Sequence, residues 1–321
     1  MIYILIAVTV VVVVSLVLVA IKYLPIIVNV FLGVRVVSPK HFEKPEGDPV
    51  DFKSLDGILL RGYFIKSAAG GGKTVIFAHE VGSSSGSWER YCRFLPKEGY
   101  NVFTFDFRGH GESENLPGYK PTQWPSTYEI EDLLGALMCV RSRPDVGDIA
   151  LFGISRGAAT CLSLADFDSS IKAIVSDSAY STEVVLATYI RKWRSMAVSQ
   201  PFINNRIPSF IYWYWRLLTL WFAEHRLRCR LISAEKSLKG GNNPPVYIIH
   251  GEKDSYIGSD NARRLFDLAR EPKEFWIVPG AKHNGSVIVR PKEYRRRVLD
   301  FLARHLSDQE TIAGADEFNG Q

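Results

Sequence analysis

Cysteine is scarce in this 321-residue sequence, and its scarcity excludes two kinds of stabilising framework. Only four cysteines occur, and no two of them show the short spacing of a zinc-binding or disulfide-bonded pair. We therefore expect buried or free thiols, which suit a reducing compartment. No motif in the chain predicts a metal or a cofactor. The four residues are Cys92, Cys139, Cys161 and Cys229.

Internal repeats and recognised nucleic-acid-binding motifs are also absent from the sequence. The formal net charge is only +5, so the chain is mildly basic, and the excess is concentrated locally. Without a motif, this charge does not predict a nucleic-acid partner. A length of 321 residues fits one large α/β domain with additions better than two independent domains.

Charge is missing altogether from the start of the chain, where no charged side chain occurs before Lys22. Residues 1–21 are almost unbroken Ile, Val, Leu and Ala. As a helix rising about 1.5 Å per residue, this run spans roughly 30 Å, the hydrocarbon core of a bilayer. A cleaved signal peptide would need a basic start and a small-residue cleavage site, and neither is present. We expect a transmembrane anchor over residues 1–22 and a juxtamembrane linker over 23–49, in which the apolar patch 26–34 extends the anchor or lies at the interface.

The basic residues nearest to this run all follow it. Lys22, Arg35, Lys40 and Lys44 lie on its C-terminal side, and only the terminal amine precedes it. The positive-inside rule then places the rest of the chain on the cytoplasmic side of the membrane. The sequence therefore predicts a single-pass membrane protein with a cytoplasmic globular domain.

The stretch Gly153-Ile154-Ser155-Arg156-Gly157 is the centre of the globular part. A short apolar run precedes it, typical of a buried parallel strand, and small or helix-forming residues follow it. Ser155 should therefore stand on a tight turn between a strand and a helix. Gly153 and Gly157 suit that turn because they have no Cβ to collide with neighbouring backbone. This is the arrangement of a nucleophilic serine.

Other strand ends supply the partners that such a serine needs. Val81 follows the apolar run 75–78, and its N–H is the predicted partner of the Arg156 N–H in an oxyanion hole. Asp177 and Asp254 both follow predicted strands and compete for the role of catalytic acid, while His283 lies in the loop after the last strand. The chain order serine, acid, histidine is that of many hydrolases. His110 could be read as a base or metal ligand, but a loop-ordering role is favoured.

From about residue 50 to about residue 306, the sequence resembles the α/β hydrolases, close to the branch of serine aminopeptidases and monoglyceride lipases. The motifs that carry the resemblance are His79-x-x-Gly82-Ser83, Asp106-x-Arg108-Gly109-His110-Gly111-x-Ser113, Gly153-x-Ser155-x-Gly157, Gly251-x-x-Asp254 and the His283 segment. The resemblance implies a mostly parallel central sheet flanked by helices, with a helical cap. It also favours Asp254 over Asp177 as the acid, because the Gly-x-x-Asp context matches the family.

Two positions depart from the family pattern. Glu80 stands where the family usually has glycine, and a carboxylate beside a forming oxyanion would oppose catalysis unless it points away or is paired. Gly258 stands in the region after the acid where the family usually has proline.

Residues 181–240 are predicted to form the cap, within a hydrolase domain over 50–306. This segment is crowded with aromatic side chains interleaved with arginines, a composition that suits a lipid headgroup region as well as ordinary packing. A polar tail over 307–321 is predicted to be disordered.

Ser155, His283 and Asp254 together predict a membrane-anchored serine hydrolase acting through an acyl-enzyme on small acyl substrates: esters or thioesters, including acyl lipids. Two alternatives stay open. A serine peptidase or aminopeptidase would need acidic residues to hold the substrate amine, and the candidates are Glu183, Glu224 and Glu235 in the cap. A catalytically inactive binding module is suggested only by Glu80.

Overall fold

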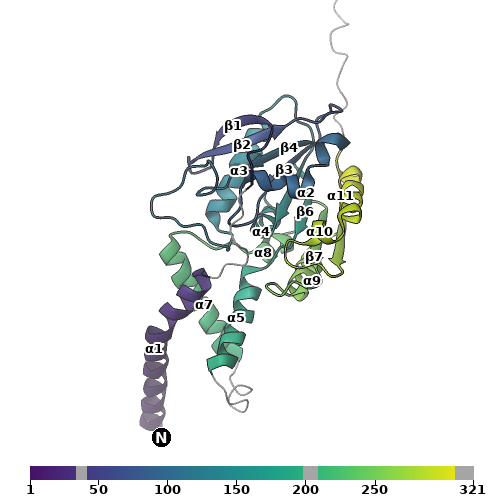
Figure 1. The fold of residues 1–321 in the computed structure, drawn as a ribbon. Coiled ribbons are helices and arrows are strands. Elements are labelled where there is room, and N and C mark those ends of the chain that lie inside the picture. The colour runs from purple at the N-terminus through teal and green to yellow at the C-terminus, as the bar shows by residue number, and fades with distance from the viewer. Residues whose placement is uncertain (34–41, 198–208, 308–321) are drawn as a thin grey trace, which may run out of the picture.

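The computed structural model describes residues 1–33, 42–197 and 209–307. The predicted tail beyond residue 307, part of the predicted linker, and Phe202 and Arg206 of the aromatic cap lie outside the described residues. Within these ranges the chain forms a central sheet covered by helices, from which three long helices project (Figure 1).

Eight strands form one sheet in the order β1-β2-β4-β3-β5-β6-β7-β8. The first two strands pair antiparallel around the Asp56-Gly57 turn, and β2 pairs antiparallel with β4, whereas all other neighbours pair parallel. The predicted mostly parallel sheet is confirmed. The strands are β1 (Asp48–Lys53), β2 (Leu59–Ile65), β3 (Thr74–Ala78), β4 (Asn101–Phe105), β5 (Ile149–Ile154), β6 (Ile171–Asp177), β7 (Val246–Gly251) and β8 (Lys273–Val278).

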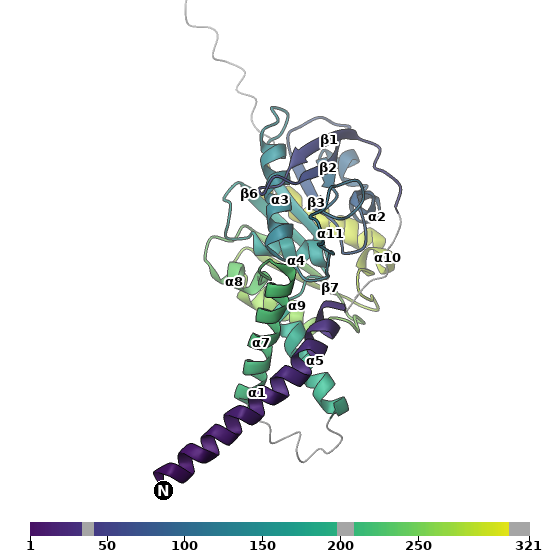
Figure 2. The same cartoon turned by 90° about the vertical axis from the view of Figure 1, so that its left-hand side faces the viewer.

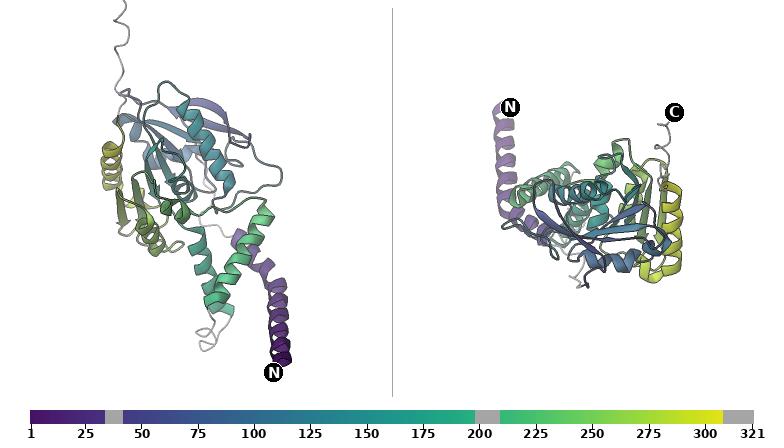
Figure 3. Two further views of the ribbon diagram at one scale, coloured as in Figure 1. Left: turned by 180° about the vertical axis from the view of Figure 1, so that it is seen from behind. Right: turned by 90° about the horizontal axis from the view of Figure 1, so that it is seen from above.

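Helices cover both faces of the sheet, giving three layers (Figure 3). One face packs against α3 (Thr127–Arg141), α4 (Arg156–Ser163), α8 (Ala234–Lys239) and α9 (Ser259–Leu268). The other packs against α2 (Trp88–Cys92) and α11 (Pro291–His305). The short elements η1 (Ser85–Ser87), η2 (Leu95–Glu98) and α10 (Ser286–Val289) complete the domain.

The strand order brings the predicted site residues to one edge of the sheet. From β3, the chain places β4 on one side and β5 on the other, so the connections diverge at the carboxyl ends of β3 and β5. Ligands of open α/β sheets bind at such a divergence. Ser155 follows β5, Asp254 follows β7 and His283 follows β8, all at this same edge.

Among the described residues, the inserted segment forms α5 (Thr182–Ala197), α7 (Ser209–Leu227) and the short α8, which packs on the sheet. The two long helices contact each other, and α7 contacts the N-terminal helix α1 (Ile2–Gly33). The helices α1, α5 and α7 project together from one end of the sheet domain, with the N-terminus at the far tip of α1 (Figures 1 and 2).

The helix α1 runs through Pro25 to Gly33, whereas the sequence analysis placed a linker from residue 23 onward. Its last third is part of a packed core, because Leu24, Val28 and Phe31 are buried against the cap. The Phe31 ring stacks on Trp124 with centroids 4.4 Å apart, and the Trp124 indole N–H donates to the Phe31 carbonyl at 2.9 Å. The second apolar patch is therefore a continuation of the helix that docks on the domain. Among the residues that the structure describes, no helix satisfies the criteria of length and hydropathy for crossing a membrane.

Candidate active site

Ser155 stands on a strained turn between β5 and α4. Its backbone has φ 53° and ψ −113°, a conformation that costs a non-glycine residue free energy and is characteristic of functional positions. The flanking glycines are needed for close packing. A Cβ on Gly157 would lie 2.1 Å from the Ala78 carbonyl oxygen, and one on Gly153 would lie 2.5 Å from the Ala158 Cα. The turn therefore packs directly against β3 and the start of its own helix.

The structure brings Ser155, His283 and Asp254 into one hydrogen-bonded chain. The Ser155 Oγ lies 2.9 Å from the His283 Nε2, and the His283 Nδ1 lies 2.5 Å from the Asp254 Oδ2. All three come from loops at the carboxyl edge of the sheet, although 128 residues separate the serine from the histidine. A base in contact with the nucleophile, itself oriented by a carboxylate, is the geometry of a serine hydrolase triad.

Asp254 is held in place by its own loop. Its Oδ1 accepts hydrogen bonds from the backbone N–H groups of Tyr256 and Ile257 at 3.0 and 2.9 Å. Burial alone would raise the pKa of this carboxyl, but the hydrogen bond from His283 and the charge of that ring outweigh burial and lower it. His250 lies 3.5 Å from the same carboxylate, and burial lowers the pKa of its imidazole, which favours the neutral form. Asp254 is therefore an ionised partner for His283.

Asp177, the rival acid, has a different set of partners. Its carboxylate accepts hydrogen bonds from the hydroxyls of Ser178, Ser286 and Tyr294 at 2.9, 3.2 and 3.0 Å. Burial raises the pKa of Asp177 to about 6 in spite of these bonds. Its backbone carbonyl accepts the Ser155 N–H at 2.8 Å. Asp177 thus supports the turn that carries the serine, and the structure places Asp254, not Asp177, on His283.

The two predicted oxyanion donors, Val81 and Arg156, come after the neighbouring strands β3 and β5. Arg156 is the first residue of α4, where backbone N–H groups have no partner within the helix. Val81 follows β3 and, with Gly82 at φ 71°, lines a large pocket. A helix N-terminus also stabilises nearby negative charge.

The Glu80 side chain is paired away from this position. Its carboxylate, only 1% exposed, accepts hydrogen bonds from Ser87 Oγ at 3.1 Å and Tyr91 OH at 3.2 Å, on η1 and α2. The condition that the sequence analysis set for this departure, that the carboxylate be paired or directed away, is met by these contacts. The Glu80 carbonyl lies 2.7 Å from the His79 Nδ1, while the His79 Nε2 accepts the Phe107 N–H. Burial, and then the Arg156 charge, lower the pKa of His79 to about 3, so this histidine is neutral and structural.

A buried ionic network lies under the pocket. The Arg156 guanidinium is fully buried, pairs with Glu129 at 3.3 Å and donates to the Thr122 carbonyl at 3.1 Å. Glu129 also completes the capping box that begins α3 at Ser126. The His110 Nε2 lies 3.4 Å from the same guanidinium, and burial together with the Arg156 charge lowers the pKa of its imidazole far below the usual value. His110 is therefore a neutral part of the pocket wall.

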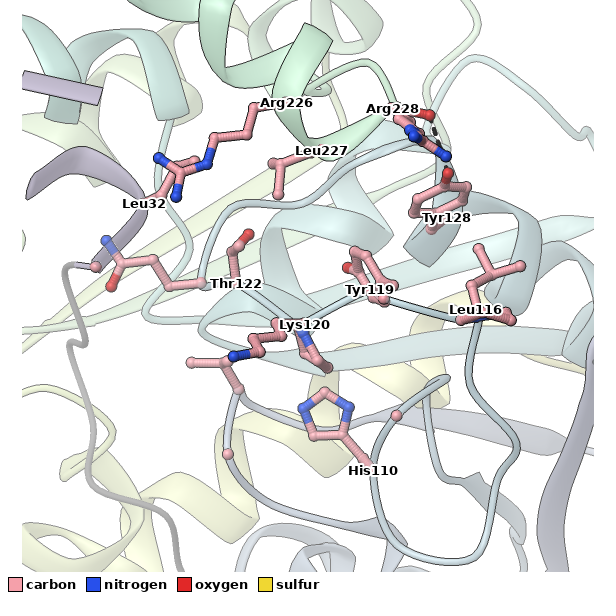
Figure 4. A pocket seen from close by; sticks show the side chains of 18 of the residues that line it. Leu32, His110, Leu116, Tyr119, Lys120, Thr122, Tyr128, Arg226, Leu227 and Arg228 are labelled. Atoms are coloured by element: carbon pink, nitrogen blue, oxygen red, sulfur yellow. Dashed lines mark hydrogen bonds between the residues drawn. The ribbon is translucent and has the colours of Figure 1, made fainter. Parts of the chain in front are cut away.

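The pocket itself has a volume of about 1140 Å³ and lies between α1, the loop 109–123 and the end of α7 (Figure 4). Figure 4 shows Arg226 and Arg228 on the α7 side of the pocket and Lys120 and His110 on the loop side. The sequence analysis missed Lys120, Gln123, Arg226 and Arg228 as site residues. They belong to no regular spacing, and only the docking of α1 and α7 brings them around one space.

A family model described as the alpha/beta hydrolase fold matches residues 73–210, and the structure superimposes on esterases of that fold. The chain has the α/β-hydrolase fold. One neighbour is an esterase of Pyrococcus furiosus, with a TM-score of 0.60 and 25% identity, covering 84% of this chain and 100% of that one. An esterase from a Rhodococcus species, with a TM-score of 0.56 and 17% identity over 81% of this chain and 100% of that one, shares the fold.

Two relatives by sequence extend the comparison. The uncharacterized protein YfhR of Escherichia coli K12 is 28% identical over 272 residues, 82% of each chain. A thiohydrolase of Aspergillus aculeatus, aneE, is 30% identical over 142 residues, 43% of each chain. Together with the esterase structures, these likenesses support hydrolase activity in general terms.

Proposed function

We propose that the protein is a membrane-anchored serine hydrolase that cleaves carboxylic esters or thioesters through an acyl-enzyme. The observation that carries the proposal is the continuous contact from the Ser155 Oγ through His283 to Asp254, at 2.9 and 2.5 Å. Serine is a weak nucleophile at its ordinary pKa and needs a base in this position.

In the proposed mechanism, the Ser155 oxygen attacks the substrate carbonyl carbon while the His283 Nε2 takes its proton. The Val81 and Arg156 N–H groups stabilise the oxyanion, each contributing about 3 kcal/mol to lowering the barrier. His283 then gives the proton to the leaving oxygen or sulfur, and the acyl group stays on Ser155. A water molecule, activated by the same histidine, releases the acid, while Asp254 keeps the ring in the correct tautomer throughout.

Esters and thioesters are favoured over peptides by two observations. Among the likenesses named above, two solved structures are esterases and one relative is a thiohydrolase. The three acids that could have held a peptide amine are already engaged. Glu235 pairs with Arg264 at 2.8 Å, Glu183 pairs with Arg216 at 3.4 Å, and Glu224 accepts the Leu231 N–H at 3.0 Å.

Membrane anchoring is supported by the surface of the projecting helices. Apolar side chains of α1 are exposed along its first twenty residues, among them Ile2 at 71% and Leu18 at 61%. On α7, Phe210, Trp213, Leu217 and Trp221 are exposed and follow helical spacing, so they form one apolar face. We infer that the apolar start of α1 inserts into the bilayer and that the α7 face touches it. The basic residues that follow residues 1–21 then keep the catalytic domain on the cytoplasmic side.

Labelling with a fluorophosphonate probe tests the chemistry. The full-length protein should be labelled, and Ser155→Ala should not, because the probe reacts only with an activated serine. Ser163→Ala is the matched control, since Ser163 lies at the other end of α4 and bonds to the Ala159 carbonyl. Equal labelling of wild type and Ser155→Ala would show that another residue is the nucleophile. Absence of labelling in the wild type would favour the inactive binding module.

Two further measurements test the bond and the membrane. Turnover of p-nitrophenyl acyl esters should exceed that of aminoacyl anilides, and the reverse order would establish the peptidase alternative.

Full-length protein should stay with the membranes after alkaline carbonate washing. Its release into the supernatant would contradict insertion of α1.

A further inference from the structure

The pocket between α1, the loop 109–123 and α7 carries a positive charge that has no role in the reaction of the triad. Three cationic side chains line it, namely Lys120, Arg226 and Arg228, and the described residues of its lining include no aspartate or glutamate. Nor does any of the three form an ion pair with another described residue. The Arg226 guanidinium instead donates to the Asn29 side-chain oxygen of α1. Within the described part of the chain, these three cations therefore have no acidic partner.

A second observation in the same pocket points to a bound ligand. Gln123 is only 3% exposed, and neither its amide nitrogen nor its amide oxygen has a hydrogen-bond partner among the described residues. An unpartnered buried amide costs free energy, about 1–3 kcal/mol, and such groups normally bind something. Gln123 lines the pocket together with Lys120 and Thr122, so a ligand placed there could accept from its NH₂ group.

Negative charge near the pocket does not neutralise its three cationic side chains. Glu129 is a buried carboxylate whose partner Tyr119 lines the pocket, and it is already paired with Arg156 and hydrogen-bonded to Tyr119 and Ser126. Guanidinium, ammonium and amide N–H groups that line one pocket are donors well suited to phosphate oxygens. The pocket adjoins the predicted oxyanion donor, because Val81 and Gly82 form part of its wall.

We propose that this pocket binds a phosphate-bearing alcohol or thiol, the leaving group of the substrate. The inference rests on the proposed function and names its substrate class: an acyl ester or thioester whose leaving group carries phosphate. The bond between the carbonyl carbon and the leaving oxygen or sulfur breaks as the Ser155 ester forms. The leaving group takes the proton from His283 and keeps its phosphate against the cations until it departs.

Matched substrate pairs on the full-length protein in detergent test this proposal. One pair is a 1-acylglycerol and the 1-acylglycerol 3-phosphate of the same chain, and the other is an acyl N-acetylcysteamine thioester and the corresponding acyl coenzyme A. The wild type should have the higher kcat/KM for the phosphate-bearing member of at least one pair, and the pair concerned tells a lipid source from a soluble one. A p-nitrophenyl ester reports the hydrolase activity itself.

Charge-reversal variants then locate the recognition. Lys120→Glu and Arg228→Glu should each lower the ratio of kcat/KM, phosphate-bearing over neutral, by about tenfold, the size of one charge-assisted hydrogen bond. Lys120→Arg should retain the ratio. Lys97→Glu is the control with the same change of charge, because Lys97 is an exposed residue of η2 outside the pocket, and it should leave the ratio unchanged.

The outcomes separate the two proposals. Turnover of the p-nitrophenyl ester with no preference within either pair, or an unchanged ratio in both reversal variants, would overturn the pocket assignment and leave the hydrolase intact. Loss of the ester turnover itself would refute the hydrolase. In that case, calorimetric binding of glycerol 3-phosphate and coenzyme A to the wild type and to Lys120→Glu decides the pocket, since equal or absent binding would refute it.

Discussion

Asp254 and Asp177 follow neighbouring strands and differ in what they contact, so single substitutions should separate their roles. Asp254→Asn keeps the size of the side chain but removes the charge that orients His283. We expect kcat/KM for a p-nitrophenyl ester to fall roughly 10³- to 10⁴-fold, the effect of losing the acid in a serine triad. Steady-state kinetics with circular dichroism as a folding check measures this. A loss below tenfold would show that Asp254 does not act on the histidine.

Asp177→Asn should instead change how stability depends on pH. Burial raises the folded-state pKa of Asp177 to about 6, above the value of 3.8 for an exposed aspartate. The stability that protonated Asp177 contributes is therefore fully present below pH 3.8 and lost as the pH rises through 6. Asparagine does not titrate. The free energy of unfolding of the wild type, relative to that of the variant, should therefore fall by about 2 kcal/mol between pH 4 and pH 7. Denaturant unfolding at both pH values measures it, and a constant difference would contradict the buried, raised carboxyl.

The reacting residues could be predicted from the sequence because each sits in a local pattern. Ser155 lies between two glycines after an apolar run, and Asp254 and His283 end predicted strands in the chain order of hydrolases. Lys120 and Gln123 have no such pattern, since their importance depends on α1 and α7 closing over a loop. The direction of the Glu80 side chain could not be predicted either. Its partners Ser87 and Tyr91 lie on η1 and α2, and both elements are too short for a hydrophobic pattern to show which face is buried.

Among the elements, α1 differs most from its prediction. Leu24, Val28 and Phe31 follow the spacing of one helical face. Because the segment is apolar at almost every position, no polar face distinguishes this buried face in the sequence. The strands and α3 were easier to predict, because alternation, turn residues and the capping box at Ser126 mark their ends.

Docking of α1 depends on Trp124, which stacks on Phe31 and donates to its carbonyl. Trp124→Ala should destabilise the full-length protein by about 3–5 kcal/mol, because it empties a fully buried site. Trp124→Phe keeps the ring contact and loses only the N–H bond, so it should cost about 1 kcal/mol. Thermal unfolding in detergent gives both values. Equal losses in the two variants would mean that the stacked ring contributes nothing.

For the whole molecule, the position of a truncation should decide whether a soluble fragment folds. A fragment that begins at Lys22 keeps Leu24, Val28 and Phe31 on the cap, whereas one that begins at residue 34 exposes Trp124, Tyr180 and Leu186. We expect the longer fragment to be monomeric and to retain ester turnover, and the shorter one to aggregate or unfold at a lower temperature. Size-exclusion chromatography and thermal unfolding test this. A stable, active fragment from residue 34 would show that α1 is dispensable for the domain.

The packing of α1 onto the cap also has a consequence for where the protein can find its substrates. A chain held by a loose tether can turn freely and sample molecules in all directions. Here the last turns of α1 share a hydrophobic core with the cap, and the same helix forms a wall of the cationic pocket. If its first twenty residues lie in lipid, the entrance keeps a constant height and tilt above the headgroups. Substrates would then arrive mainly by sliding within the leaflet, and crowding of that leaflet would govern the rate.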